Sequence, residues 1–157
     1  MIEFKEISYE VVTVGEEFMS DDFLIKPEDV ETFAFAVDDH DPWYFAASPD
    51  SPDSPYKGNI AHPVLMGNQA LFMRHGKYIV PAGLHAKMHY EFVAPFRVGM
   101  RVRTRGKLID KYEKRGRHYM VTEFATRDEE TGEVLVRGNF TQMLLHQSGV
   151  HQHAKNR

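Results

Sequence analysis

The stretch AHPVLMGNQALFMRH, residues 61–75, predicts a helix that is buried on nearly all sides. Pro63 suits the first turn of a helix, and Gly76 follows the stretch as a typical helix end. Between them, apolar side chains occupy most of the helical circumference, a pattern typical of a helix that the rest of its domain encloses. We therefore expect this helix to lie at the centre of the fold.

After this helix, the sequence changes to the period of a strand. In LHAKMHYEF, residues 84–92, apolar and polar side chains alternate, which predicts one apolar and one wet face. Three further strand-like runs follow, and EKRG and EETG are the expected turns between them. The runs cover about residues 100–110, 117–127 and 133–146, and the apolar face of the first strand is formed by Leu84, Ala86, Met88, Tyr90 and Phe92. An antiparallel sheet must cover its apolar face, so we expect it to wrap around the central helix.

Before the central helix, the sequence predicts a short leading strand and a second, shorter helix. Pro27 suits the first helical position, and Glu28 and Asp29 place negative charge at the positive end of the helix dipole. The turn formers of DDHDP predict that this helix stops within residues 38–42. The proline-rich segment SPDSPDSPYK, residues 48–57, is expected to be a loop.

Length and composition predict a single domain over residues 1–147, with a flexible tail at residues 148–157. The net charge of −4 argues against a nucleic-acid binder, and the alternating cations of residues 101–107 are interpreted as one solvated strand face. The chain has no cysteine, which excludes disulfides and thiolate metal sites. It has no apolar stretch of membrane-spanning length and no signal-peptide pattern at its start, so we expect a soluble cytoplasmic protein without membrane contact.

Two segments on either side of the loop resemble a known family. FAFAVDDHDPWY (residues 33–44) and NIAHPVLM (residues 59–66) are similar to the signature of MaoC-like hydratases. In that signature a helix is followed by an Asp-x-Asn-Pro-x-His turn, a variable loop and an Ala/Val-His-Gly opening of the central helix. HYEFVAPFRVGMRV and GEVLVRGNFTQML resemble the family's later strands, so the likeness spans about residues 14–145. Within the family, the chain is more similar to the N-terminal dehydratase-type branch.

The resemblance implies an α+β hot-dog fold, in which an antiparallel sheet wraps around a central buried helix. It also implies a homodimer or a higher oligomer that acts on an acyl-CoA or an acyl-carrier thioester, without metal or organic cofactor. The implied reaction is the reversible addition of water across an enoyl thioester. A polar pair must take a proton from water and return one to C2, and a helix N-terminal amide must polarise the thioester carbonyl.

Three residues are the catalytic candidates that this resemblance implies. Asp39 stands at the family's Asp position, whereas Tyr44 stands where the family has its catalytic His. A phenol with an ordinary pKa of about 10 is a poor base at neutral pH, but it can donate a hydrogen bond. His62 is the candidate to replace the missing acid or base. Each residue also has a structural alternative: a turn former for Asp39, an aromatic packing residue for Tyr44, and a helix-start residue for His62.

Pro63 replaces the family's Gly after His62, so the usual oxyanion amide is missing and Val64 or Leu65 would have to supply one. The acyl chain is expected to lie along the central helix, where Asn68 and Gln69 interrupt an otherwise apolar surface. The predicted substrate-binding residues are Val64, Leu65, Met66, Asn68, Phe72 and Met73. Arg74, Lys77 and Lys57 are candidates for the phosphates of coenzyme A, with a solvated charge as the alternative for each.

A second interpretation is a non-catalytic hot-dog subunit that binds the acyl chain and pairs with a catalytic hot-dog partner. Loss of both the His and the Gly is what such a subunit would show. A thioesterase is disfavoured because the central helix contains no Asp or Glu. His85 and His89 are four residues apart, but on a strand this spacing does not suit a zinc site, so no metal site is predicted.

Overall fold

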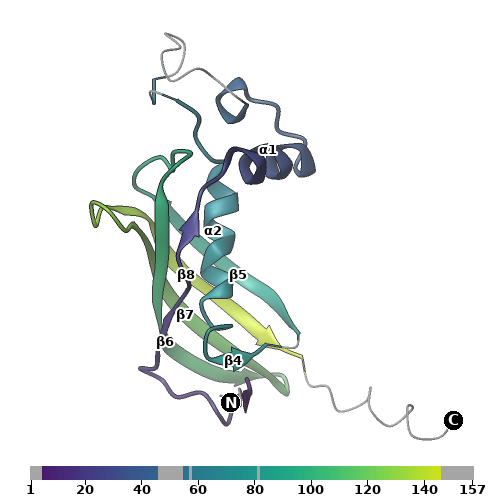
Figure 1. The fold of residues 1–157 in the computed structure, drawn as a ribbon. Coiled ribbons are helices and arrows are strands. Elements are labelled where there is room, and N and C mark those ends of the chain that lie inside the picture. The colour runs from purple at the N-terminus through teal and green to yellow at the C-terminus, as the bar shows by residue number, and fades with distance from the viewer. Residues whose placement is uncertain (1–4, 46–54, 57, 81, 146–157) are drawn as a thin grey trace, which may run out of the picture.

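The computed structural model describes residues 5–45, 55–56, 58–80 and 82–145. Figure 1 shows a curved antiparallel sheet that wraps around one helix, α2, with a second helix, α1, across its end. The sheet has six strands, in the order β2-β6-β7-β8-β5, and β3 also pairs with β6. The predicted arrangement of a sheet around a central helix is therefore confirmed. Residues 148–157 lie outside the described residues, and the single domain over residues 1–147 stays a prediction.

The helices are α1 (Pro27–Ala36), the short 3-10 helix η1 (Pro42–Tyr44) and α2 (Pro63–Phe72). The strands of the main sheet are β2 (Glu17–Met19), β3 (Phe23–Leu24), β5 (Gly83–Phe92), β6 (Arg101–Lys114), β7 (Arg117–Asp128) and β8 (Val134–Leu144). A separate parallel pair is formed by β1 (Lys5–Glu6) and β4 (Tyr78–Ile79). The expectation of one leading strand was wrong, because three strands precede α1. Each has only two or three residues, too few to show a period.

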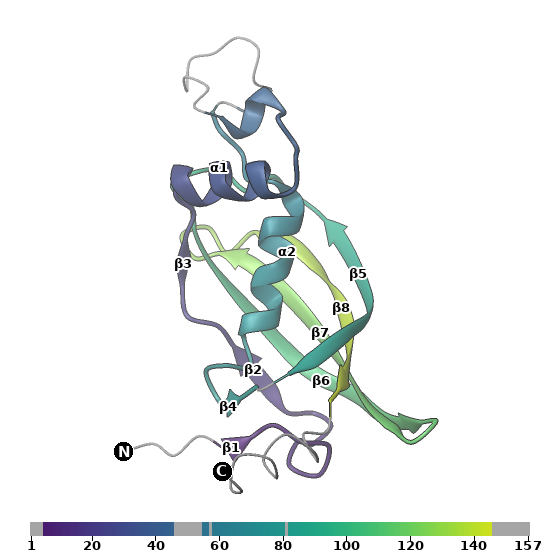
Figure 2. The same cartoon turned by 90° about the vertical axis from the view of Figure 1, so that its right-hand side faces the viewer.

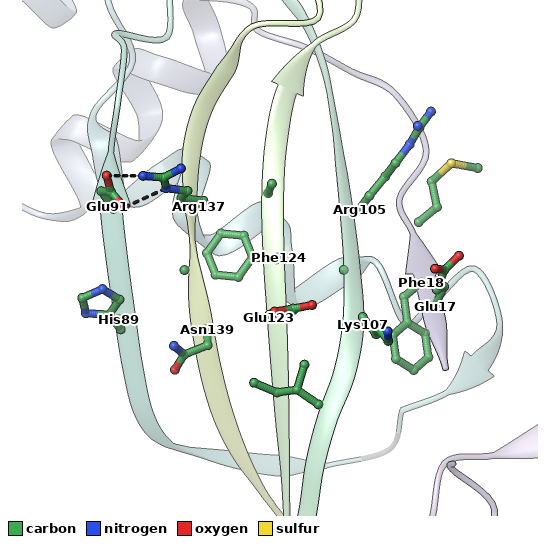
Figure 3. Close-up of a pocket in the computed structure, with 15 residues that line it drawn as sticks. Glu17, Phe18, His89, Glu91, Arg105, Lys107, Glu123, Phe124, Arg137 and Asn139 are labelled. Carbon is green, nitrogen blue, oxygen red and sulfur yellow. Dashed lines mark hydrogen bonds and ion pairs between the residues drawn. The ribbon is translucent and has the colours of Figure 1, made fainter. Parts of the chain in front are cut away.

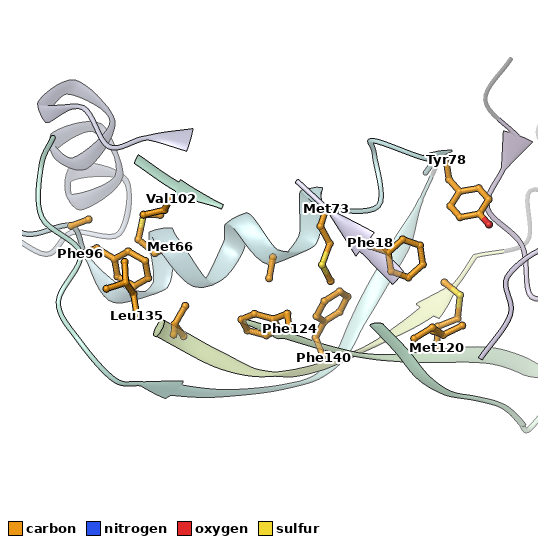
Figure 4. Packing of buried hydrophobic residues seen from close by; sticks show 14 of the residues in the cluster. Phe18, Met66, Met73, Tyr78, Phe96, Val102, Met120, Phe124, Leu135 and Phe140 are labelled. Atoms are coloured by element: carbon orange, nitrogen blue, oxygen red, sulfur yellow. The ribbon is translucent and has the colours of Figure 1, made fainter. Parts of the chain in front are cut away.

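The core lies between α2 and the inner face of the sheet (Figure 4). The view in Figure 2 shows α2 lying along this face, with α1 across the upper end of α2. Met66 and Ala70 of α2, and Met73 just after it, expose 0% of their surface. On the sheet side, the equally enclosed residues are Leu108, Met120 and Leu135. This burial explains why a helix with so few polar positions is stable where it lies: the sheet and the helix remove each other's apolar surface from water.

The hairpin between β6 and β7 turns at the predicted EKRG segment. Arg115 and Gly116 both have positive φ angles, 53° and 69°. Two central residues of this kind form the tight turn whose twist matches that of the flanking strands. The turn fixes the register in which β6 and β7 pair over most of their length.

A β-bulge changes the predicted faces of β5. The register shifts between His85 and Lys87, so that two residues of β5 oppose one residue of β8 there. Leu84 pairs with Met143 on the outer face, whereas Met88 pairs with Phe140 on the inner face. The expectation that Leu84 shares a face with Met88 was therefore wrong, because an uninterrupted alternation assumes an uninterrupted ladder.

The carboxylate of Glu16 links the residues before β2 to the start of β4. Its Oε1 accepts a hydrogen bond from the Tyr78 hydroxyl at 2.6 Å and pairs with Lys77 Nζ at 2.5 Å, and its Oε2 accepts from the Thr13 amide at 3.2 Å. Burial raises the pKa of Glu16, but the hydrogen bonds from Lys77, Tyr78 and Thr13 outweigh it, and the pKa lies below the ordinary 4.5. Burial and the bond to Glu16 raise the pKa of Tyr78 to about 12.

Replacing this carboxylate is expected to remove an acid-sensitive part of the stability. A lowered carboxyl pKa stabilises the fold fully above pH 4.5, and this stabilisation is lost as the pH falls through the folded-state pKa. Glu16→Gln should lower the free energy of unfolding by about 1–2 kcal/mol at pH 7 and by much less near pH 3. Urea unfolding at both pH values measures the difference. Glu17→Gln is the matched control, and an equal loss in both variants would contradict the prediction.

Candidate active site

The end of α1 fixes the position of Asp39. Asp38 has a φ angle of 57°, the left-handed conformation that commonly ends a helix. Its amide donates to the Phe35 carbonyl at 3.2 Å, and the Asp39 amide donates to the Ala34 carbonyl at 3.0 Å. These two hydrogen bonds satisfy the last carbonyls of the helix and hold the Asp39 backbone against it.

The Asp39 carboxylate faces the start of α2. Its Oδ2 lies 3.4 Å from His62 Nε2. Its Oδ1 accepts a hydrogen bond from the Asp41 amide at 3.2 Å. The side chain of Asp39 is 40% exposed and that of His62 only 17%, so water reaches the pair from the carboxylate side.

His62 serves as the N-cap of α2. Its Nδ1 accepts a hydrogen bond from the Val64 amide at 3.1 Å, as the side chain of a helix cap does. Because Nδ1 is an acceptor, a neutral ring carries its proton on Nε2, the ring nitrogen that lies 3.4 Å from the Asp39 carboxylate. The ring also contacts Phe33 and Tyr44, with ring centroids 5.2 and 5.4 Å away. His62 thus combines the predicted structural role with the position of a site residue.

Tyr44 lies beside the His62 ring at the end of η1. Asp41 caps η1, since its Oδ1 accepts from the Trp43 amide at 2.9 Å, and the Trp43 carbonyl accepts from the Ile60 amide at 3.1 Å. These bonds join η1 to the chain that leads into α2. Burial, and next the charges of Asp39 and Asp41, raise the pKa of Tyr44. The phenol therefore stays protonated at neutral pH and is a hydrogen-bond donor, not a base.

The structure thus brings the three catalytic candidates together around one ring. Phe33 of α1 also contacts this ring, and the sequence did not indicate it as a site residue. The two amides proposed to replace the one missing at Pro63 are both engaged: Val64 donates to His62 Nδ1 and Leu65 to the His62 carbonyl at 3.0 Å. Neither is free to polarise a thioester carbonyl.

The predicted substrate-binding residues divide into two groups. Met66 and Met73 lie in the closed core and expose 0% of their surface. Val64 and Phe72 are 40% and 55% exposed, and Leu65 and Asn68 are half-buried, as is Gln69. Only the second group is accessible to a ligand.

Both alternatives for Arg74, a solvated charge and a contact with a phosphate, were wrong, because the side chain is buried. Arg74 exposes 1% of its surface and lies over the Phe140 ring, 4.9 Å from its centroid. Its guanidinium donates to Gln142 Oε1 and Thr122 Oγ1, and burial lowers its pKa to about 10. Lys77 pairs with Glu16, and Lys57 lies outside the described residues.

A hollow of about 880 Å³ lies on the outer face of the sheet, which is turned away from α2 (Figure 3). Side chains of both charges line it, and Arg137 donates to both carboxylate oxygens of Glu91 at 2.7 Å. Arg105 and Lys107, two of the alternating cations of β6, also line it. Asp39, Tyr44 and His62 are not among its lining residues, so the hollow is not the substrate pocket of this site.

Within the described residues, no group of three or more His, Asp or Glu side chains could hold a metal ion. The absence of a cofactor stays a prediction.

No helix in the described part of the chain has the length and apolarity that a membrane span requires.

Comparisons with known proteins agree on one architecture. The family model described as FAS1-like, dehydratase domain region, matches residues 12–137. A search of curated proteins finds no match. Among solved structures, the R-hydratase PhaJ1 from Pseudomonas aeruginosa has a TM-score of 0.75 at 17% identity, covering 94% of this chain and 95% of that one.

Two further solved structures are similar over most of their length. The MaoC-like dehydratase from Rhodospirillum rubrum has a TM-score of 0.72 at 16% identity, with 90% of this chain and 98% of that one covered. The HadBC (3R-hydroxyacyl-ACP dehydratase) complex from Mycobacterium tuberculosis has a TM-score of 0.70 at 20% identity, with 83% and 96% covered. At these identities the likeness shows the fold, and that fold is the predicted hot-dog fold.

Proposed function

Because the chain belongs to the FAS1-like dehydratase-domain-region family, within the MaoC-like hot-dog proteins, we propose that it adds water to, or removes it from, an enoyl thioester. The observation that carries this proposal is the 3.4 Å approach of His62 Nε2 to Asp39 Oδ2. The two residues are more than twenty positions apart in the chain, and the Asp39 carboxylate of this pair is accessible to water. The substrate is an acyl chain on coenzyme A or on a carrier protein.

In hydration, the oxygen of the attacking water bonds to C3 while Asp39 takes a proton from that water. Asp39 then returns a proton to C2. The carboxylate suits both steps, because a carboxyl group can accept and release a proton at one position. His62 cannot take a second proton on Nδ1 while this atom accepts the Val64 amide. Its Nε2–H therefore orients and stabilises the Asp39 carboxylate instead of shuttling the proton.

Tyr44 supplies the hydrogen bond that the helix amides cannot give. Pro63 has no N–H, and the amides of Val64 and Leu65 are engaged. The Tyr44 phenol stays protonated because burial and the neighbouring carboxylates raise its pKa. A neutral phenol beside the pair can donate to the thioester oxygen as negative charge develops there.

The test is an assay of the purified chain with crotonyl-CoA and longer enoyl-CoAs, next to Tyr44→Phe. The wild-type chain should hydrate at least one of them. Tyr44→Phe keeps the ring and removes only the donor, so kcat should fall by about 10²-fold with little change in KM. A wild-type chain that is inert at all chain lengths would contradict the enzymatic proposal, and an unchanged kcat in Tyr44→Phe would contradict the role of the phenol.

A second candidate is a non-catalytic subunit that binds the acyl chain beside a catalytic hot-dog partner. Two observations favour it: Tyr44 stands at the position of the family's His, and the first helix amides are engaged. Calorimetry with crotonyl-CoA, on the wild type and on Asp39→Asn, tests this candidate. Equal affinity of the two chains without turnover by either supports the subunit, whereas turnover by the purified wild-type chain alone contradicts it.

Either function is proposed to operate in an assembly formed along β5. Among the described residues, this strand of 10 residues is the sheet edge next to β8 (Figure 2), and a long edge strand pairs readily with another strand. Apolar side chains near it are accessible: Phe92 is 44% exposed and Val93 51%. A second hot-dog chain, identical or different, would extend the sheet there, and sedimentation velocity of the purified chain measures the state.

A further inference from the structure

The space between α2 and the sheet cannot hold an acyl chain. Met66 and Ala70 of α2 and Met73, which caps its end, expose 0% of their surface, and Figure 4 shows Met66 and Met73 turned toward the sheet. Phe124 and Phe140 fill the sheet side of the same layer. An acyl chain that starts at Asp39 and His62 must therefore follow a flank of α2 rather than its buried face.

One flank of α2 begins at the site and runs beside β5. Val64, Gly67 and Leu71 share this flank, because residues three and four apart lie on one side of a helix. Val64 is 40% exposed and Leu71 half-buried. At Gly67, a Cβ atom would lie 2.9 Å from Cε1 and from Cζ of Tyr90 on β5. The Tyr90 ring thus rests on the helix backbone and crosses this flank.

The sheet is also built to hold the Tyr90 ring. Tyr90 pairs with Gly138 of β8, which has no side chain on the inner face. The ring packs against Phe92 and Phe124, with centroids 5.6 and 5.7 Å away, and its hydroxyl contacts Met88 Sδ at 3.6 Å. Two glycines and two aromatic rings therefore fix the ring in its position.

We propose that Tyr90 limits the length of the acyl chain, so that the protein acts on short enoyl thioesters. The inference rests on the proposed function, since it takes the Asp39–His62 pair as the place where C3 lies. Gly67 follows His62 by five residues, which at 1.5 Å per residue is about 7.5 Å along the axis of α2. A chain extended along the flank meets the Tyr90 ring within that distance.

The test compares crotonyl-CoA with dodecenoyl-CoA in the wild type and in Tyr90→Val, which removes the ring but keeps a strand-forming side chain. The wild type should prefer crotonyl-CoA. In Tyr90→Val, kcat/KM for dodecenoyl-CoA should rise about tenfold, the factor that burial of roughly two more methylene groups supplies. Tyr90→Phe, which keeps the ring, should retain the wild-type preference.

Tyr119→Ala is the matched control for the loss of a tyrosine ring. Tyr119 lies on the outer face of β7, stacked on Tyr112 with centroids 5.0 Å apart, so this variant should leave the chain-length preference unchanged. A wild-type preference for dodecenoyl-CoA, or a Tyr90→Val variant that is folded by circular dichroism and keeps the wild-type profile, would overturn the proposal.

Binding of the saturated analogues separates this proposal from the proposed function. Affinities for butyryl-CoA and dodecanoyl-CoA are measured by calorimetry in the same variants. If no variant shows turnover but Tyr90→Val gains about tenfold in affinity for dodecanoyl-CoA, the hydratase proposal fails and the role of Tyr90 stands. If turnover is present and neither activity nor binding shifts, the role of Tyr90 fails alone. Absence of both turnover and acyl-CoA binding overturns both.

Discussion

Asp39→Asn is expected to lower kcat for hydration by about 10²- to 10⁴-fold, the range that one positioned general base contributes. The amide keeps the size of the side chain and its acceptor for the Asp41 amide. It cannot take a proton from water, so the chemical step is lost while the site keeps its shape. Stopped-flow or steady-state hydration of the best enoyl-CoA measures the change, and KM should change little.

Asp41→Asn is the matched control, because it makes the same chemical change two residues away. An amide oxygen still caps η1 by accepting from the Trp43 amide, so activity should be kept.

His62→Asn tests whether Asp39 and His62 act as a pair. Asparagine is a good N-cap for α2 but is too short to reach Asp39 as the ring does. The double variant of Asp39 and His62 should be no worse than Asp39→Asn alone. Fully additive losses would contradict the paired arrangement.

Gly138→Ala is expected to be the most destabilising single-methyl change in the sheet. A Cβ at this position would overlap the carbonyl oxygen of His89 and would lie 2.9 Å from the His89 carbonyl carbon and 3.2 Å from Tyr90 Cα. All three are backbone atoms of β5, so no side chain can move aside. Strands β5 and β8 would have to separate, at a cost of about 3 kcal/mol or more in the free energy of unfolding.

Thermal unfolding followed by circular dichroism measures this cost, with an expected fall in Tm of about 6–12 °C. Gly76→Ala is the control, since its Cβ would meet only the carbonyl oxygens of Met19 at 3.3 Å and Met73 at 3.9 Å, in an exposed turn. It should change the free energy of unfolding by less than about 1 kcal/mol. Equal Tm values for the two variants would show that β5 and β8 do not pack as closely as described.

Local pattern predicted the elements that are long enough to repeat it. The apolar circumference within residues 61–75 indicated the buried helix, and the strand-like run of residues 117–127 indicated β7. Both are consequences of the helix and strand periods alone. The two-residue strands and the bulge in β5 were missed, because each depends on which partner strand is available rather than on its own residues.

At the site, the sequence by itself determined which residues are candidates: Asp39 and Tyr44 follow α1, and His62 precedes α2. The tertiary structure decided how they work together. It brings the Asp39 carboxylate to 3.4 Å from His62 Nε2, uses His62 Nδ1 as the cap of α2, and buries Arg74 away from any phosphate. The cap is a local contact, whereas the Asp39–His62 approach and the burial of Arg74 depend on contacts between segments far apart in the chain, which leave no periodic signal in the sequence.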